Sequence, residues 1–124
     1  MINEIESLEI IKGKEILDIE TEISMIAPID ISNKDEIMIE IPLKIIFDKY
    51  TLFIYNKWSI IGGTLKCIED LKRRKISDIK ANSQILELRF NSLDYIKVDL
   101  SNDGYIGPES IVLHGPNDLI IVWN

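Results

Sequence analysis

The stretch that decides the fold is LEIIKGKEILDI at residues 8–19, because a similar stretch, IEDLKRRKISDI, returns sixty positions later at residues 68–79. Five of the twelve aligned positions are identical: Glu9/Glu69, Lys12/Lys72, Ile16/Ile76, Asp18/Asp78 and Ile19/Ile79. A second similarity follows each copy, since LKIIF from Leu43 resembles LELRF from Leu86. The chain is therefore predicted to consist of two related halves that pack together.

Length and composition favour one folded domain over residues 1–124. A chain of this size buries roughly two-thirds of the surface that its unfolded form exposes. Hydrophobic residues make up 46% of the chain and charged residues 28%, as in folded rather than disordered proteins. Isoleucine alone occurs 27 times, and this excess of β-branched side chains favours strands.

Cysteine usage and the N-terminal sequence point to the cytoplasm. Cys67 is the single cysteine, so neither a disulfide within the chain nor a cysteine-based metal site is possible. The first ten residues lack the basic region and continuous apolar run of a secretion signal, and no apolar stretch is long enough to span a bilayer. We therefore expect a soluble cytoplasmic protein.

Periodicity predicts a short helix followed by three strands in the first half. Asn3 and Glu6 have the spacing of a capping box, and Gly13 is a plausible helix end. Strands are predicted over residues 19–25, 37–47 and 51–55 from apolar residues that alternate with polar ones. Because Pro42 has no N–H group to donate, it is expected to place its strand at an edge or a bulge.

The same order is predicted for the second half, followed by a hairpin. Thr64 can cap a short helix that reaches Leu71. Strands are predicted over residues 75–81, 86–90, 96–100, 111–114 and 119–123. The turn at residues 115–118 has proline at its second position and is predicted to be of type I. The last strand is apolar on both faces, which predicts that both faces are covered.

These elements predict an α+β fold that is mostly β, as a curved antiparallel sheet or a barrel-like sandwich. It would be built from two related α-β-β-β halves, at residues 3–58 and 64–101, with a C-terminal hairpin at residues 110–123. The order of the strands stays open, since a sandwich, a half-closed barrel and a single bent sheet all satisfy the pattern.

Catalytic motifs are absent from the sequence. His114 is the one side chain of the usual neutral-pH acid–base kind, and in a strand before a turn it is expected to be structural. Ser110 lies outside any Gly-x-Ser-x-Gly motif, and Gly62 and Gly63 lack the spacing of a phosphate-binding loop. We expect no enzyme and no cofactor. The alternative is a small enzymatic or ligand-binding domain that uses His114 with Glu109.

Carboxylates are abundant and are a second candidate for a functional site. Glu20 and Glu22 would project from one face of a strand about 7 Å apart. Further acidic residues follow at Asp35, Glu36 and Glu40. Such a spacing could hold a divalent cation or supply an acid–base pair if the carboxylates were buried together. Without a calcium-binding loop of the EF-hand type, a solvated acidic face is the favoured interpretation, and no metal is predicted.

Charge is distributed unevenly along the chain. Residues 1–40 contain eleven acidic and three basic side chains, residues 41–80 four and nine, and residues 81–124 six and two, for a net charge of −7. An acidic first third would repel nucleic acid and anionic membranes and would attract a basic protein. The charge could equally serve solubility alone. The basic run at residues 72–75 is interpreted as a helix C-terminus rather than a nucleic-acid patch.

The C-terminal third resembles a class of small bacterial proteins. GPES at residues 107–110, VLHGP at residues 112–116 and IVW at residues 121–123 are similar to the C-termini of immunity proteins encoded beside polymorphic or contact-dependent toxins, and the starts of the two halves are similar too. This resemblance implies a cytoplasmic protein that binds and occludes one cognate toxin, commonly a basic nuclease. It carries over no individual functional residue.

The first hypothesis is therefore an immunity protein with a basic toxin as partner, and with neither nucleic acid nor membrane. The predicted contacts are the acidic residues Glu20, Glu22, Asp35, Glu36 and Glu40, with Tyr50, Tyr55 or Trp58 as aromatic anchors. Trp58 is equally compatible with the core. The second hypothesis is the enzymatic or ligand-binding domain that uses His114. The third is a self-associating module, a monomer or weak homodimer that pairs through the strand with Pro42 or through residues 119–123.

Overall fold

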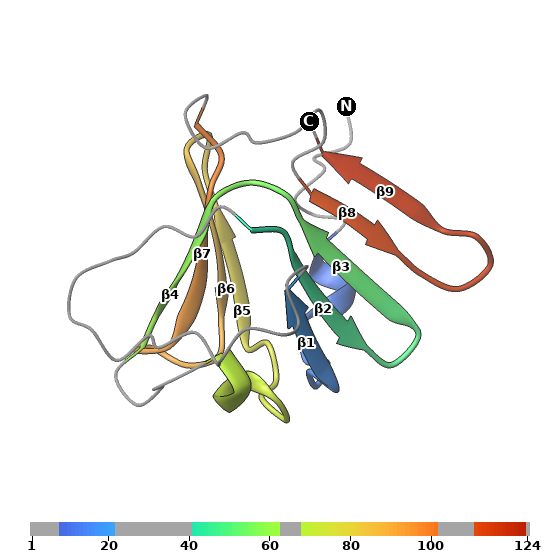
Figure 1. Ribbon diagram of the computed structural model, residues 1–124, viewed down its shortest axis with the longest axis horizontal. Coiled ribbons are helices and arrows are strands. Elements are labelled where there is room, and N and C mark those ends of the chain that lie inside the picture. The colour runs from blue at the N-terminus through green and yellow to red at the C-terminus, as the bar shows by residue number, and fades with distance from the viewer. Residues whose placement is uncertain (1–7, 22–40, 63–67, 102–110, 124) are drawn as a thin grey trace.

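The computed structural model describes residues 8–21, 41–62, 68–101 and 111–123 (Figure 1). These residues form short 3-10 helices and β-strands. The first half contains η1 (Leu8–Ile11), β1 (Asp18–Thr21), β2 (Leu43–Phe47), β3 (Tyr50–Ile54) and β4 (Trp58–Ile61). The second half contains η2 (Ile68–Leu71), β5 (Asp78–Ala81), β6 (Ile85–Arg89), β7 (Tyr95–Asp99), β8 (Ile111–His114) and β9 (Ile120–Trp123).

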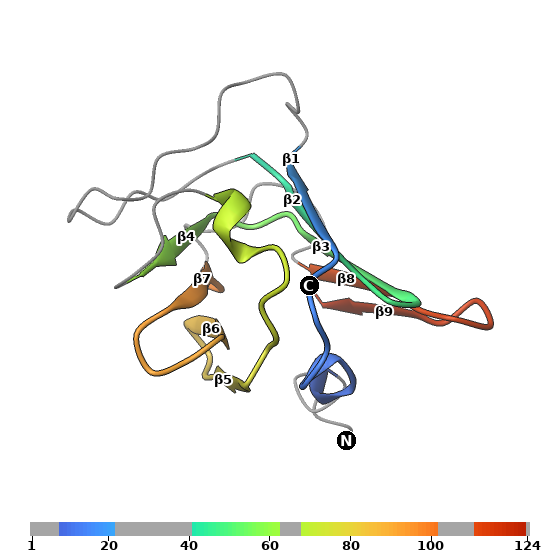
Figure 2. The ribbon, with the colours of Figure 1, turned by 90° about the horizontal axis from the view of Figure 1, so that it is seen from below.

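The strands form two antiparallel sheets, which Figure 2 shows as two layers. The five-stranded sheet has the order β1-β2-β3-β8-β9 and the four-stranded sheet the order β4-β7-β6-β5. Alternating residues of both sheets contribute to one buried hydrophobic cluster that includes Ile45, Leu52, Trp58, Leu88 and Ile96. The prediction of a mostly β, antiparallel sandwich is confirmed, and the sheets do not close into a barrel.

Each half passes its fourth strand to the sheet of the other half. β4 follows β3 in the chain but pairs with β7, and Trp58 lies opposite Val98. β8 follows β7 but pairs with β3, and Ile111 lies opposite Ile54. Trp58 and Ile111 thus occupy equivalent positions in the two halves. The sheets are interlocked, because each is completed by a strand of the other half. β4 was not among the strands predicted from the sequence.

The repeated stretch pairs with its own copy at the junction of the two sheets. Glu15 and Lys75, which are equivalent, form a β-bridge. Two reciprocal pairs of backbone hydrogen bonds flank it: Gly13 N to Ile76 O (2.7 Å) with Arg73 N to Ile16 O (2.8 Å), and Ile16 N to Arg74 O (2.8 Å) with Ile76 N to Lys14 O (3.2 Å). Because every bond has its counterpart sixty residues away, the two stretches are related by an approximate two-fold symmetry.

Salt bridges repeat this symmetry on the surface. Lys72 lies 3.2 Å from Asp18, and Lys12 lies 3.6 Å from Asp78, so each copy's lysine meets the other copy's aspartate. Each aspartate also accepts a hydrogen bond from the next backbone N–H at 2.9 Å. The identities at these positions therefore have a structural counterpart, since each pair joins a lysine of one copy to an aspartate of the other.

The predicted helices are shorter than expected in the residues that the structure describes. Each is a single 3-10 turn, Leu8–Ile11 or Ile68–Leu71, and Asn3, Glu6 and Thr64 lie outside the described residues. Gly13 follows the first turn with φ of +84°, as expected for a residue that ends a helix. The strands predicted at residues 19–25 and 37–47 are observed as Asp18–Thr21 and Leu43–Phe47. Residues 22–40 lie outside the described part of the chain, and Ile41 and Pro42 precede the second of these strands.

The position expected for Pro42 was wrong. β2 lies between β1 and β3 and is a central strand, not an edge. Pro42 immediately precedes Leu43, the first residue of that strand. A proline can stand there because a residue ahead of the ladder has no inter-strand hydrogen bond to donate.

Two features of the C-terminal hairpin also differ from the prediction. Asn117 and Asp118 have φ of 59° and 61°, and Leu119 N donates to Pro116 O, so the turn has the positive φ pair of type I′ rather than type I. That turn matches the right-handed twist of the strands that it joins. β9 is an edge strand, and Ile120 is 57% exposed, so its two faces are not both covered.

Candidate partner-binding face

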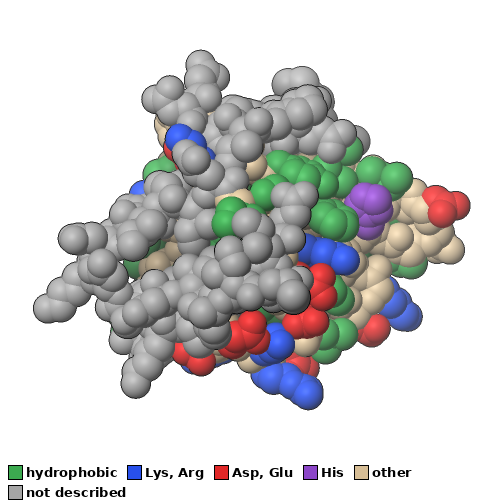
Figure 3. Space-filling model, in the orientation of Figure 1, with side chains coloured by type: hydrophobic (Ala, Val, Ile, Leu, Met, Phe, Trp, Pro, Cys, Tyr) green, Lys and Arg blue, Asp and Glu red, His purple; other side chains and the backbone are tan. Residues whose placement is uncertain are grey.

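The outer face of the five-stranded sheet, which points away from the hydrophobic cluster, presents two rows of side chains across its strands. The strand registers place Asp18, Ile46, Thr51, His114 and Ile120 in one row. They place Glu20, Lys44, Phe53, Val112 and Val122 in the other. The face is acidic at β1 and apolar toward β9. Figure 3 shows its hydrophobic side chains beside the histidine.

We call the apolar part of this face the outer strip, which comprises Ile46, Phe53, Tyr55, Val112, Ile120 and Val122. Ile46, Phe53, Tyr55 and Val122 are half-buried and Ile120 is exposed. Val112 is 4% exposed, although it does not belong to the core cluster that contains its neighbours Ile111 and Leu113. The strip is thus a second apolar surface, on the opposite side of the sheet from the core.

Aromatic rings meet at the centre of the outer strip. The ring of Phe53 is nearly parallel to that of Tyr55, at 8° with 6.3 Å between centroids. The ring of His114 meets Phe53 edge-on at 5.3 Å. Lys44 Nζ lies 5.7 Å from the centroid of Phe53, within the range of a cation–π interaction. Phe53 therefore links the strip to its charged margin.

A groove of about 370 Å³ opens at this margin. It is lined by Glu20, Thr21, Pro42, Leu43, Lys44, Phe53 and Tyr55. Glu20 Oε2 lies 3.7 Å from Lys44 Nζ, and both side chains remain more than two-fifths exposed. The groove combines aromatic walls with an ion pair that solvent can reach, which is a suitable recess for a side chain of another protein.

The acidic margin is tied to the junction of the repeats. The backbone N–H of Ile19 and the ammonium of Lys72 both interact with the Asp18 carboxylate and hold its pKa below the ordinary value of 3.8. Glu69 and Asp18 in turn raise the pKa of Lys72. These charges are solvated, so they contribute a local field more than stability.

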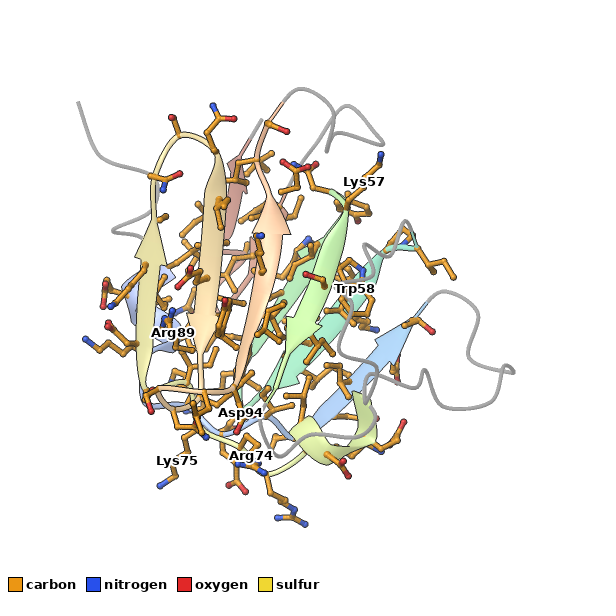
Figure 4. The ribbon with its side chains drawn as sticks, turned by 90° about the vertical axis from the view of Figure 1, so that its left-hand side faces the viewer. Lys57, Trp58, Arg74, Lys75, Arg89 and Asp94 are labelled. Atoms are coloured by element: carbon orange, nitrogen blue, oxygen red, sulfur yellow. The ribbon has the colours of Figure 1, made fainter. Side chains whose placement is uncertain are left out.

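The corresponding face of the four-stranded sheet has different chemistry (Figure 4). Its rows are Lys80, Glu87, Lys97 and Ser59, and Asp78, Arg89, Tyr95 and Ile61. Arg89 donates to Glu87 at 2.7 and 2.8 Å, and its guanidinium lies 4.3 Å from the Tyr95 ring centroid. This face is charged and satisfies much of its own charge.

Some of the predicted contact residues lie on the candidate face. Glu20 and Tyr55 line its groove. Tyr50 is half-buried, with Lys14 Nζ 5.0 Å from its ring centroid, and it packs against the core cluster. The remaining acidic candidates lie outside the described residues: Glu22, Asp35, Glu36 and Glu40.

Trp58 belongs to the core, which is one of the two alternatives that the sequence left open, and it is not exposed as a contact anchor. Its side chain is fully buried, and its indole Nε1 donates to Ile41 O at 2.7 Å. The bulky ring fills the space between the sheets where β4 crosses to the other half, and a hydrogen bond satisfies its polar atom there.

Of the residues proposed for a site at His114, only His114 lies within the described residues. His114 ends β8 and is exposed, as expected for a strand residue before a turn, but it does not line the groove. Its proposed partner Glu109, and Ser110, lie outside the described residues. Within the described ranges, no three His, Cys, Asp or Glu side chains gather closely enough to hold a metal ion.

The sequence-based search missed Ile46, Phe53 and Val112. A signal was present for Ile46 and Phe53, which are apolar residues at outward positions of alternating strands, whereas β8 is apolar at three successive positions and gives no such signal for Val112. Acidic residues drew attention instead, since net charge is visible in a sequence whereas the side of a sheet that faces solvent is not.

Comparisons with known proteins leave this face to be interpreted from its own geometry. No protein-family model matches the chain, and no curated protein and no solved structure matches it either. Among the residues described, no helix has the length and apolar character needed to cross a membrane.

Proposed function

We propose that this protein binds a basic protein toxin through the outer strip and its acidic margin, and neutralises that toxin by occlusion. The observation that carries the proposal is the contrast between equivalent positions of the two sheets. Ile46 and Phe53 in the five-stranded sheet correspond to Arg89 and Lys97 in the four-stranded sheet. Because the same fold accepts charged residues there, folding alone does not require the apolar ones.

Apolar side chains on an outer face need a different reason, and contact with another protein supplies it. The cores of protein interfaces are enriched in aromatic residues and depleted in charge, with polar residues at the rim. Phe53 and Tyr55 provide the aromatic centre, and Glu20 and Lys44 stand at the edge. This arrangement supports binding to a protein surface, because apolar and aromatic side chains make up most of the contact area that it presents.

Charge selects the kind of partner. The chain carries a net charge of −7, and Asp18 and Glu20 lie at the β1 end of the strip. An acidic surface steers a basic protein toward it and accelerates association. Occlusion of a basic active-site cleft would follow from binding alone, which agrees with the resemblance of the C-terminal third to immunity proteins.

The test is co-expression with the product of the adjacent gene that the resemblance implies as toxin. The decisive variant, Ile46→Arg with Phe53→Lys, places on the strip the residues that stand at the equivalent positions of the other sheet. It should fold normally and lose at least roughly a hundredfold in affinity, as expected for hot-spot residues. Protection of the host cell should be lost with it.

The matched control is Lys80→Ala on the opposite outer face, which should bind and protect like the native chain. Glu20→Lys should slow association and reduce its dependence on salt, because it alters steering rather than packing. If the double variant binds the toxin as tightly as the native protein, the outer strip is not the interface.

A further inference from the structure

We propose that β9 is an edge at which a second copy of this chain adds its own β9 in antiparallel orientation. The two five-stranded sheets would then form one continuous sheet across a two-fold axis. This inference does not depend on the proposed toxin, because it concerns the backbone edge of the sheet and not the side chains of its outer face.

The first observation is that the sheet edges are protected unequally. Two edges carry charged side chains, with Asp18 and Glu20 on β1 and Asp78 and Lys80 on β5. The edge at β4 is covered, since its first three residues are at most 8% exposed. Charges and burial are the ordinary means by which proteins prevent edges from pairing.

Among the described residues, Ile120 to Val122 of β9 have neither the charges of β1 and β5 nor the burial of β4. It consists of IIVW and contains no charged residue and no proline. Ile120 is 57% exposed, and Ile121 and Val122 are half-buried. A strand of β-branched residues with an open edge is a template for another strand.

Backbone geometry identifies which residues would pair. Gly115 N donates to Leu119 O at 2.9 Å, which begins the hydrogen-bonded ladder between β8 and β9. Because hydrogen-bonded and non-hydrogen-bonded pairs alternate in an antiparallel ladder, Ile120 and Val122 direct their N–H and C=O groups away from β8. These are the groups that a new strand would engage.

A two-fold axis restricts the register. To use both outward residues, Ile120 must lie opposite Val122 of the second copy, with Ile121 opposite its own counterpart on the axis. About four backbone hydrogen bonds would form, two from each of the Ile120–Val122 pairs. Ile120 and Val122 of the two copies would then be neighbours on the outer face, and the outer strip would continue across the axis.

Charge permits this self-association although each copy is acidic. Asp118 is the acidic residue nearest to β9 in the described hairpin, and the two copies of it would be roughly 20 Å apart. Asp18 and Glu20 lie four strands from β9, so the two β1 edges would be separated by roughly 40 Å. Both separations exceed the screening length of about 8 Å at physiological salt. An apolar strand meeting its own copy therefore brings no like charges of the described residues together.

Sedimentation from micromolar to millimolar concentration tests the proposal. We expect a monomer–dimer equilibrium, and Ile120→Lys should weaken dimerisation by roughly tenfold or more because it adds charge to the edge. Leu93→Lys is the matched control, since Leu93 is 61% exposed between β6 and β7 of the other sheet and its substitution should leave the dimer unchanged. Circular dichroism would show that both variants keep the native sheet.

Cysteine crosslinking tests the register. In a Cys67→Ser background, Ile121→Cys should form a disulfide between copies, because residues facing each other on the axis have Cα atoms about 4.5 Å apart. Ile120→Cys should not crosslink, because its counterpart lies two positions away.

Three results would overturn the proposal. One is a protein that stays monomeric at millimolar concentration. Another is a dimer that Ile120→Lys does not weaken, and the third is efficient crosslinking through residue 120 in place of residue 121. If a monomeric chain gains hydrogen-exchange protection at β9 only when the toxin is added, the edge receives a strand of the toxin and the second-copy proposal is wrong.

Discussion

The outer faces of the two sheets occupy equivalent positions in two related halves, yet their chemistry differs. The four-stranded face pairs Arg89 with Glu87 and places Arg89 over Tyr95. The five-stranded face groups Phe53 with Tyr55 and His114. The core-facing positions do not diverge in this way, since Leu43 and Leu86, and Phe47 and Phe90, are buried in both halves. The fold constrains the inside of each sheet and leaves its outside free to serve another purpose.

The largest expected effect concerns the strands that cross between the halves. Trp58→Ala removes a fully buried ring and should lower the free energy of unfolding by roughly 3–5 kcal/mol. Ile111→Ala, at the equivalent position of β8, should cost roughly 2–4 kcal/mol. Urea denaturation followed by circular dichroism measures both losses. Because the halves are interlocked, each variant should unfold in one cooperative step, and two separate transitions would contradict the shared core.

The next effect concerns the outer face of the four-stranded sheet, where Arg89 interacts with Glu87 and Tyr95. Arg89→Met removes a guanidinium that is 21% exposed, together with its bonds to Glu87 and its contact with Tyr95. We expect a loss of roughly 1 kcal/mol in the free energy of unfolding. Ile46→Met, at the equivalent position of the five-stranded face, should change stability by less than about 0.5 kcal/mol. Equal losses would remove the energetic distinction between the two faces.

A smaller effect on stability is expected at a position where the two copies of the repeat differ in sequence. Gly13 and Arg73 are equivalent and have φ of 84° and 74°, a conformation that glycine adopts without strain. Arg73→Gly should therefore stabilise the protein by roughly 0.5–1 kcal/mol, and Gly13→Ala should cost roughly 1 kcal/mol. No atom lies within 4 Å of a Cβ added at Gly13, so its cost would come from the backbone alone. Thermal unfolding of both variants measures these differences, and destabilisation by Arg73→Gly would contradict them.

The smallest effect depends on pH. Because the folded-state pKa of Asp18 lies below 3.8, its ionised form contributes stability above that value, and the contribution is lost as pH falls through the folded pKa. Asp18→Asn should flatten the acid side of the stability profile, and only slightly, because the carboxylate and Lys72 are 42% and 41% exposed. Lys72→Met should flatten it less, since the bond from Ile19 remains. Urea denaturation at several pH values between neutral and acidic measures the free energy of unfolding of each variant. An unchanged pH profile for Asp18→Asn would rule out this linkage.

Local pattern predicted much of this molecule and tertiary contacts decided the rest. Alternation placed β3, β6 and β7 close to their observed bounds, because the side-chain period of a half-buried strand is visible in sequence, and the turn at residues 115–118 between two apolar runs placed β8 and β9. β4 was missed since WSII is buried at every position but the last and shows no alternation. Pro42 was misplaced and Trp58 was left undecided for a related reason, because strand order and burial are properties of the packed sheets.

By itself, the sequence determined that the chain forms antiparallel sheets, that its two halves are related, and that it is acidic. These are consequences of side-chain period, identity and charge, which are local quantities. Only the tertiary structure decided that the fourth strands exchange sheets, that the repeated stretches pair with each other, and that Phe53 and Tyr55 gather on an outer face while β9 stands at an edge. Those features depend on pairings between residues far apart in the chain, and such pairings are selected by the burial of the whole core.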